Sequence, residues 1–163
     1  MGSLNIKVTN SLNFLNKLLD ESDDICEFCY EALDALCDVD IDEDGYNAKI
    51  RKIGNRFEVN VDDTLDDLLA AYELFKRDYE EIAENKNTDE VIYSLKKFSN
   101  ISDDIKIELK KYDRMMIKVD AKRDVYHREK DFVRYIAINK IYTYASRVST
   151  LLEKSMAKCD KIS

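Results

Sequence analysis

The segment "DDIKIELKKYDRMMIKVDAKRDVYHREKDFVRYIAINKIYTYASRVSTLLEKSMAK", residues 103 to 158, decides the fold because it contains neither proline nor glycine. These two residues are the strongest helix breakers, so the composition of the segment predicts no interruption. One continuous helix of about 55 residues would be roughly 80 Å long at 1.5 Å per residue. We therefore predict a very long C-terminal helix.

The apolar residues of this segment form two separate seams. The first holds Ile105, Leu109, Tyr112, Met116 and Val119, and the second holds Val133, Ala137, Ile141, Ala145, Val148 and Leu152. Between the seams, residues 120 to 131 are mostly polar, so this middle part is expected to be solvated. Two arrangements remain open: the helix projects beyond the bundle, or it bends near residues 124 to 130 and its halves pack separately.

The rest of the chain also predicts helices, because its apolar residues recur at intervals of three and four. Four hydroxyl residues that are each followed by carboxylates mark expected helix starts, namely Ser22, Thr64, Thr88 and Ser102. Together with an opening helix from about Asn10, this pattern predicts an all-α bundle of about five helices.

One segment departs from helical periodicity. In "YNAKIRKIGNRFEVNVDD", Phe57, Val59 and Val61 alternate with polar residues, and the Gly-Asn pair at residues 54 and 55 suits a two-residue turn. We predict a small β-hairpin at about residues 47 to 61. It should lie on the helices, because an isolated hairpin is only marginally stable in water.

Length and composition restrict the class of protein. A chain of 163 residues usually forms one domain, so residues 1 to 163 are expected to be a single helical domain with the hairpin as an insertion. The residues are 45% apolar and 37% charged, and no apolar run approaches the roughly 18 residues of a membrane span. The N-terminus lacks the pattern of a secretory signal, and we therefore expect a cytoplasmic protein.

Charge is distributed unevenly along the chain, whose net charge is -8. Residues 1 to 104 carry 26 acidic and 11 basic side chains, whereas residues 105 to 163 carry 8 acidic and 15 basic ones. Either the two parts pack side by side and partly neutralise each other, or the second part presents a basic face to an anionic partner.

Basic side chains are concentrated on the first half of the predicted long helix. The candidate residues for binding a partner or an anion are Lys110, Lys111, Arg114, Lys118, Lys122, Arg123, Arg128 and Arg134. Tyr112, Tyr126 and Tyr135 lie among them, and basic residues with aromatic ones suit phosphates and stacked bases. Acidic residues are interleaved, several of them four positions from a base, so a self-paired solvent face is the alternative interpretation.

Residues 107 to 131, "IELKKYDRMMIKVDAKRDVYHREKD", resemble the long helices of BAR-type membrane-bending modules. The resemblance implies a dimer of extended helices with a basic face that binds an anionic membrane. It covers about a sixth of the chain. The predicted hairpin, the short early helices and the acidic first half depart from the three long helices of that family.

The stretch "DIDEDGYNAKIR", residues 40 to 51, begins like an EF-hand calcium loop. Asp40, Asp42 and Asp44 stand at its first, third and fifth positions, and a glycine follows at the sixth. The twelfth position, which supplies a bidentate carboxylate in such loops, is Arg51. An acidic turn is therefore favoured, and a weak divalent-cation site at the three aspartates is the alternative.

Few residues point to catalysis or to a cofactor. Cys26, Cys29 and Cys37 lie on an apolar stripe and are interpreted as buried thiols, with part of a zinc site as the alternative. The single histidine, His127, lies in the polar middle of the predicted long helix, and the sequence contains no phosphate-binding glycine loop and no nucleophile motif. We predict a protein that is not an enzyme and that uses no cofactor and no small-molecule substrate.

These features predict a helical protein–protein interaction module, which would be an adaptor, an inhibitor or an assembly subunit. The long C-terminal helix is its expected docking surface, because its seam suits a coiled coil with a partner helix or with a second copy in a homo-oligomer. Binding of an anionic membrane surface or of nucleic acid through residues 105 to 134 is the first alternative, and divalent-cation binding is the second.

Overall fold

The computed structural model describes residues 2–38 and 43–163, and in these ranges the chain is all-α, as predicted. The elements are α1 (Gly2–Cys37), α2 (Glu43–Phe57), the π-helical segment η1 (Glu58–Asp62), α3 (Asp63–Glu84), α4 (Asp89–Ile92), α5 (Leu95–Arg128) and α6 (Phe132–Ile162). The backbone stays in the right-handed helical region at both ends of η1, so α2, η1 and α3 form one continuous rod. Counted with that rod as one element, the described residues contain the expected five or so helices.

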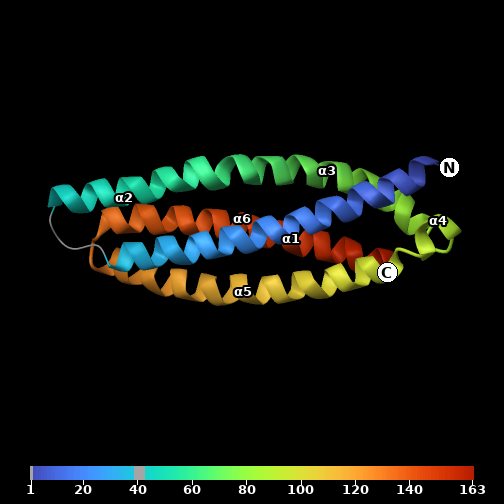
Figure 1. The fold of residues 1–163 in the computed structure, drawn as a ribbon. Coiled ribbons are helices and arrows are strands. Elements are labelled where there is room, and N and C mark those ends of the chain that lie inside the picture. Colours follow the sequence, from blue (N-terminus) through green and yellow to red (C-terminus); the bar gives the residue numbers. More distant parts are fainter. Residues whose placement is uncertain (1, 39–42) are drawn as a thin grey trace.

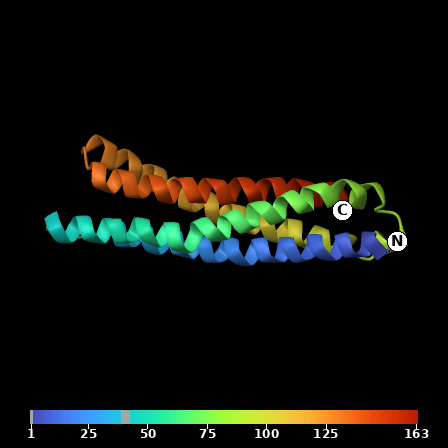
Figure 2. The same cartoon turned by 90° about the horizontal axis from the view of Figure 1, so that it is seen from above.

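Four long rods run alternately up and down along an elongated bundle (Figures 1 and 2). They are α1, the rod of α2 and α3, α5 and α6, and the single turn of α4 connects α3 to α5. α1 and α6 contact each other and lie between the other two rods. The main packing partners of α5 are α6 and α1, so it lies on one flank of the bundle and one of its sides faces outward.

The predicted helix start at Ser22 is wrong, because α1 continues through this residue. Ser22 is fully buried, and it follows Leu15 and Leu18 and precedes Ile25 at the spacing of a single helical face. Ser102 is likewise buried inside α5, and Thr64 lies inside α3, whereas Thr88 does precede α4. A hydroxyl side chain is small enough to continue a packed seam, so a serine followed by carboxylates marks a cap only where the chain on its N-terminal side leaves the helix.

The predicted β-hairpin at residues 47 to 61 is also wrong, because α2 and η1 occupy this segment and no strand occurs among the described residues. Ile50, Ile53, Phe57 and Val61 are all buried, and their spacing of three, four and four residues is that of one helical face. Two of the three alternating apolar residues that suggested a strand, Phe57 and Val61, belong to this helical face as well. Burial against α1 and α6 therefore decides in favour of the helix.

The prediction of one very long C-terminal helix is corrected as well. α5 ends at Arg128 and α6 begins at Phe132, and the two helices pack lengthwise against each other as an antiparallel pair (Figure 1). The alternative that the segment bends near residues 124 to 130, so that its halves form two helices instead of one rod, is therefore the correct one. The two halves, α5 and α6, lie side by side within the bundle, and neither projects beyond it.

The reversal is closed by a helix C-cap of the Schellman type. The amide of Lys130 donates to the carbonyl of His127, and the amide of Asp131 donates to that of Tyr126. Lys130 adopts a left-handed backbone with φ of 58°, a conformation usually taken by glycine. Asp131 then caps α6, because its carboxylate accepts a hydrogen bond from the backbone amide of Arg134 at 3.3 Å.

Candidate functional site on helix α5

The basic residues predicted as a binding surface lie on two helices. Lys110, Lys111, Arg114, Lys118, Lys122, Arg123 and Arg128 belong to α5, whereas Arg134 lies in the first turn of α6, beyond the chain reversal. Three of the eight, Lys110, Arg114 and Lys122, are exposed and form neither an ion pair nor a cation–π contact with another described residue. The other five have neighbours that hold them against the bundle or against their own helix.

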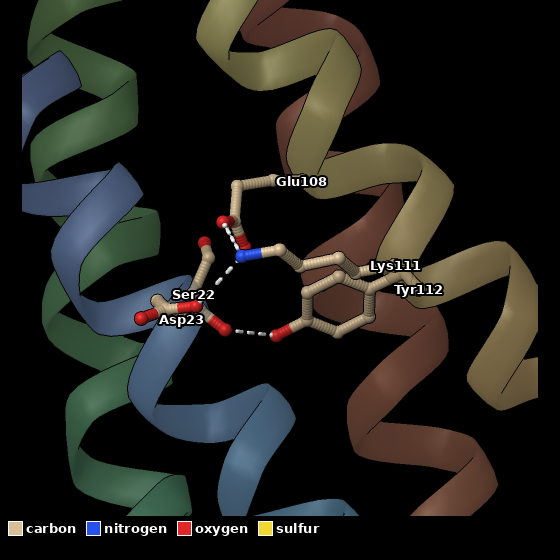
Figure 3. A network of polar contacts seen from close by, with 5 residues as sticks. All are labelled: Ser22, Asp23, Glu108, Lys111 and Tyr112. Carbon is tan, nitrogen blue, oxygen red and sulfur yellow. Dashed lines mark hydrogen bonds and ion pairs between the residues drawn. The ribbon is translucent and has the colours of Figure 1, made fainter.

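The ammonium group of Lys111 lies between two carboxylates (Figure 3). Its Nζ is 2.9 Å from Oε1 of Glu108, one turn earlier in α5, and 3.1 Å from Oδ1 of Asp23 on α1. The hydrogen bond with Glu108, and next the one with Asp23, raise the pKa of Lys111 above its ordinary value. Glu108 is only 8% exposed, so Lys111 neutralises a buried carboxylate and links α5 to the acidic helix α1.

Arg123 and Arg128 pair within their own helix. Nη2 of Arg123 is 2.8 Å from the carboxylate of Asp120, and its guanidinium lies over the ring of Tyr142 on α6, 4.0 Å from the ring centroid. Nε of Arg128 is 3.4 Å from Asp124, and both of these side chains are exposed. Arg123 therefore helps to join α5 to α6, whereas the exposed pair of Arg128 adds little stability.

Lys118 and Arg134 contact aromatic rings. Nζ of Lys118 lies 5.3 Å from the ring centroid of Tyr30 on α1. Arg134 pairs with Asp131 at 3.4 Å and lies 5.7 Å from the ring centroid of Tyr126. These contacts place Lys118 at the edge of α5 that faces α1 and Arg134 beside the turn, so the predicted patch is not one continuous surface.

The outward side of α5 combines exposed basic residues with an exposed isoleucine. Lys110, Arg114, Ile117 and Ala121 follow one another at spacings of four, three and four residues, and all are exposed. Ile117 is 70% exposed. We call these four residues the outer ridge. The sequence contained the signal for it, since Ile117 falls outside the buried seam of Ile105, Tyr112 and Val119.

Neither the acidic residues nor the single histidine forms a metal-binding cluster in the described part of the chain. No group of three or more His, Cys, Asp or Glu side chains there is placed to hold a metal ion. The ring of His127 is exposed and lies 5.3 Å from that of Tyr135. Asp40 and Asp42 lie outside the described residues, as does the side chain of Asp44, so the weak cation site at these aspartates stays a prediction.

The cysteines divide into buried and exposed thiols. Cys26, Cys29 and Cys159 are buried, and burial raises their pKa values to about 11, about 12 and about 12, respectively. Cys37 is exposed at the end of α1, which corrects the prediction that it is buried. Its Sγ lies 3.6 Å from the hydroxyl of Tyr126 on α5. The three buried thiols stay protonated at neutral pH and pack within the hydrophobic core.

The chain matches no protein-family model, no curated protein and no solved structure. Within residues 2–38 and 43–163, no helix is both long and apolar enough to cross a membrane.

Proposed function

We propose that the chain is a non-catalytic helical interaction module, either an adaptor, an inhibitor or an assembly subunit, and that it binds another protein through the outer ridge of α5. The observation that carries the proposal is the exposure of Ile117, at 70%, between basic residues that have no ion pair among the described side chains. Interfaces are typically centred on an apolar anchor that becomes fully buried, with charged residues around it.

The position of α5 in the bundle supports this proposal. α5 lies on a flank and packs against α6 and α1, so its outward side is open along the length of the helix. Its 34 residues span about 50 Å at 1.5 Å per residue. A partner with apolar and acidic residues on one face would complement Ile117, Lys110 and Arg114.

The test compares the unaltered chain with Ile117→Glu and with a matched control. Leu74→Glu is the control, because Leu74 is 57% exposed on α3, on the opposite flank from α5. Each immobilised protein is offered the same cell extract, and self-association is measured by light scattering. Partners of the outer ridge are retained by the unaltered chain and by Leu74→Glu, and their retention by Ile117→Glu falls by about tenfold or more. Equal retention by all three proteins, together with a monomer in every case, contradicts the proposal.

Binding of an anionic membrane surface or nucleic acid is the second candidate function. It is favoured by the exposed and unpaired basic groups of Lys110, Arg114 and Lys122. Such binding depends on charge, so retention on vesicles of acidic lipid or on a DNA duplex should fall steeply between low and moderate salt. Capture of a protein partner at the outer ridge should resist the same change, because its anchor is apolar. Salt-independent retention on vesicles and DNA, or none, excludes this candidate.

A further inference from the structure

The edge of α5 that faces α1 forms a second surface, separate from the outer ridge. α1 and α5 leave an open groove with two hollows of about 450 and 390 Å³ that meet at Asn16. The hollows extend over residues 9 to 23 of α1 and residues 97 to 111 of α5. At 1.5 Å per residue, the groove is therefore about 20 Å long.

Apolar side chains from both helices line this groove. Leu12 and Leu19 contribute from α1, where they lie two turns apart and are half-buried. Ile101 and Ile107 contribute from α5, and Ile107 is 57% exposed. Amphipathic helices dock in grooves of this kind, with apolar anchors spaced at three, four or seven residues along one face.

One end of the groove is strongly acidic. The hollow beside Ile107 is lined by Asp20, Asp23, Asp104 and Glu108, with Lys111 as the only basic residue among its lining side chains. Asp20 and Asp104 are exposed and pair with no basic group in the described ranges. A basic side chain opposite these two carboxylates would be favoured by charge complementarity.

The buried carboxylate of Glu108 reinforces this acidic character. Lys111 bonds to its Oε1, but its Oε2 is buried and accepts no hydrogen bond from any described residue. Lys111 is shared between Glu108 and Asp23 (Figure 3). The four carboxylates that line this hollow therefore carry an excess of negative charge.

We propose that the groove between α1 and α5 binds an amphipathic helix of a partner protein that carries basic residues beside its apolar face. Its apolar face covers Leu12, Leu19 and Ile107, and its basic residues pair with Asp20 and Asp104. The outer ridge and the groove then give the two sides of α5 opposite charge, so one module can bind two different partners. The groove does not depend on the proposed function of the outer ridge.

The experiment uses the full chain labelled with ¹⁵N and two synthetic helical peptides of about 18 residues, a length that covers the groove at 1.5 Å per residue. Both peptides have the same leucine face. One carries lysines beside that face, and the other carries glutamates at the same positions. Affinity is measured by fluorescence anisotropy, and the binding site is mapped from amide chemical shifts. We expect the basic peptide to bind at least about tenfold more tightly than the acidic one and to shift the amides of Asn16, Leu19 and Ile107.

Matched variants assign the binding to the groove. Asp20→Asn combined with Asp104→Asn should lower the affinity for the basic peptide by about tenfold. Asp66→Asn combined with Asp67→Asn, at exposed residues of α3, makes the same change in net charge and should leave this affinity unaltered. Ile117→Glu should also leave it unaltered, which separates the groove from the outer ridge. Urea unfolding checks that each variant is folded. The proposal is overturned if no peptide binds below about 100 µM, if both peptides bind equally, or if the shifts map outside the groove.

Discussion

The hydroxyl of Tyr112 in the middle of α5 donates a 2.7 Å hydrogen bond to the backbone carbonyl of Ser22 in the middle of α1. The neighbouring residues of the two helices, Lys111 and Asp23, form the ion pair beside it (Figure 3). Two adjacent polar contacts thus fix the position of α5 along α1. Since the groove is built from the same two helices, this register also sets which side chains face each other across it.

Replacing Tyr112 tests the weight of this hydrogen bond. Tyr112 is fully buried, and burial raises the pKa of its hydroxyl far above the ordinary value. Tyr112→Phe removes only the hydrogen bond and should lower the free energy of unfolding by about 0.5–1.5 kcal/mol, whereas Tyr112→Ala also leaves a cavity and should cost about 3–5 kcal/mol. Urea unfolding followed by circular dichroism measures both. Tyr93→Phe, at a residue that is 83% exposed, is the control. If Tyr112→Phe is as stable as this control, the hydrogen bond of Tyr112 does not contribute to the stability of the fold.

The buried thiols predict a loss of stability at alkaline pH. Burial raises the pKa of Cys26 to about 11 and those of Cys29 and Cys159 to about 12, so the folded chain keeps these thiols neutral while the unfolded chain ionises them from about pH 8.5. The stability that these neutral thiols contribute to the folded chain is fully present below about pH 8.5 and is lost as pH rises toward about 12. The slope is at most about 1.4 kcal/mol per pH unit for each thiol.

Cys29→Ala isolates one of these thiols. The variant should lose stability less steeply between pH 8.5 and 11 than the unaltered chain, as measured by urea unfolding at several pH values. Ser99→Ala, at an exposed residue of α5 without an ionisable side chain, should leave the slope unchanged. Identical slopes in all three proteins would show that Cys29 ionises as readily in the folded chain as in the unfolded one.

The turn between α5 and α6 predicts a stabilising substitution. Lys130 adopts φ of 58°, which costs a residue with a side chain roughly 1 kcal/mol relative to glycine. Lys130→Gly should therefore raise the free energy of unfolding by about 0.5–1 kcal/mol. Lys122→Gly removes the same charge inside α5 and should instead lower it by about 1 kcal/mol. Were the segment one straight helix, both substitutions would destabilise.

Gly54 distinguishes the helix from the predicted hairpin. In α2 this glycine has an ordinary helical backbone, and a Cβ atom at this position would come closest to the flexible end of Lys140, with Nζ at 3.2 Å. Gly54→Ala should raise the free energy of unfolding by up to about 1 kcal/mol, because alanine favours a helix. In a two-residue hairpin turn the same change would destabilise, since that turn requires positive φ. A higher melting temperature of Gly54→Ala than of the unaltered chain therefore indicates a helix at this position, and a lower one indicates a hairpin turn.

The sequence alone determined that the chain is helical and which side chains form most of its core. Ile105, Tyr112, Ile141 and Val148 are buried as their spacing predicts, because apolar residues three and four apart must share one face of a helix. The absence of proline and the scarcity of glycine exclude frequent breaks. The solvated middle of the last segment was also visible, and the reversal occurs at its end.

Only the tertiary structure decided where the helices break and which faces stay open. Lys130 takes a left-handed conformation, and Ser22 continues a helix, because the packing of α5 on α6 and of α1 on its neighbours outweighs local preferences of about 1 kcal/mol. The same packing brings Lys111 of α5 against Asp23 of α1 and leaves Ile107 and Ile117 exposed. Exposure depends on which helices lie alongside, and that is set by contacts between residues far apart in the sequence.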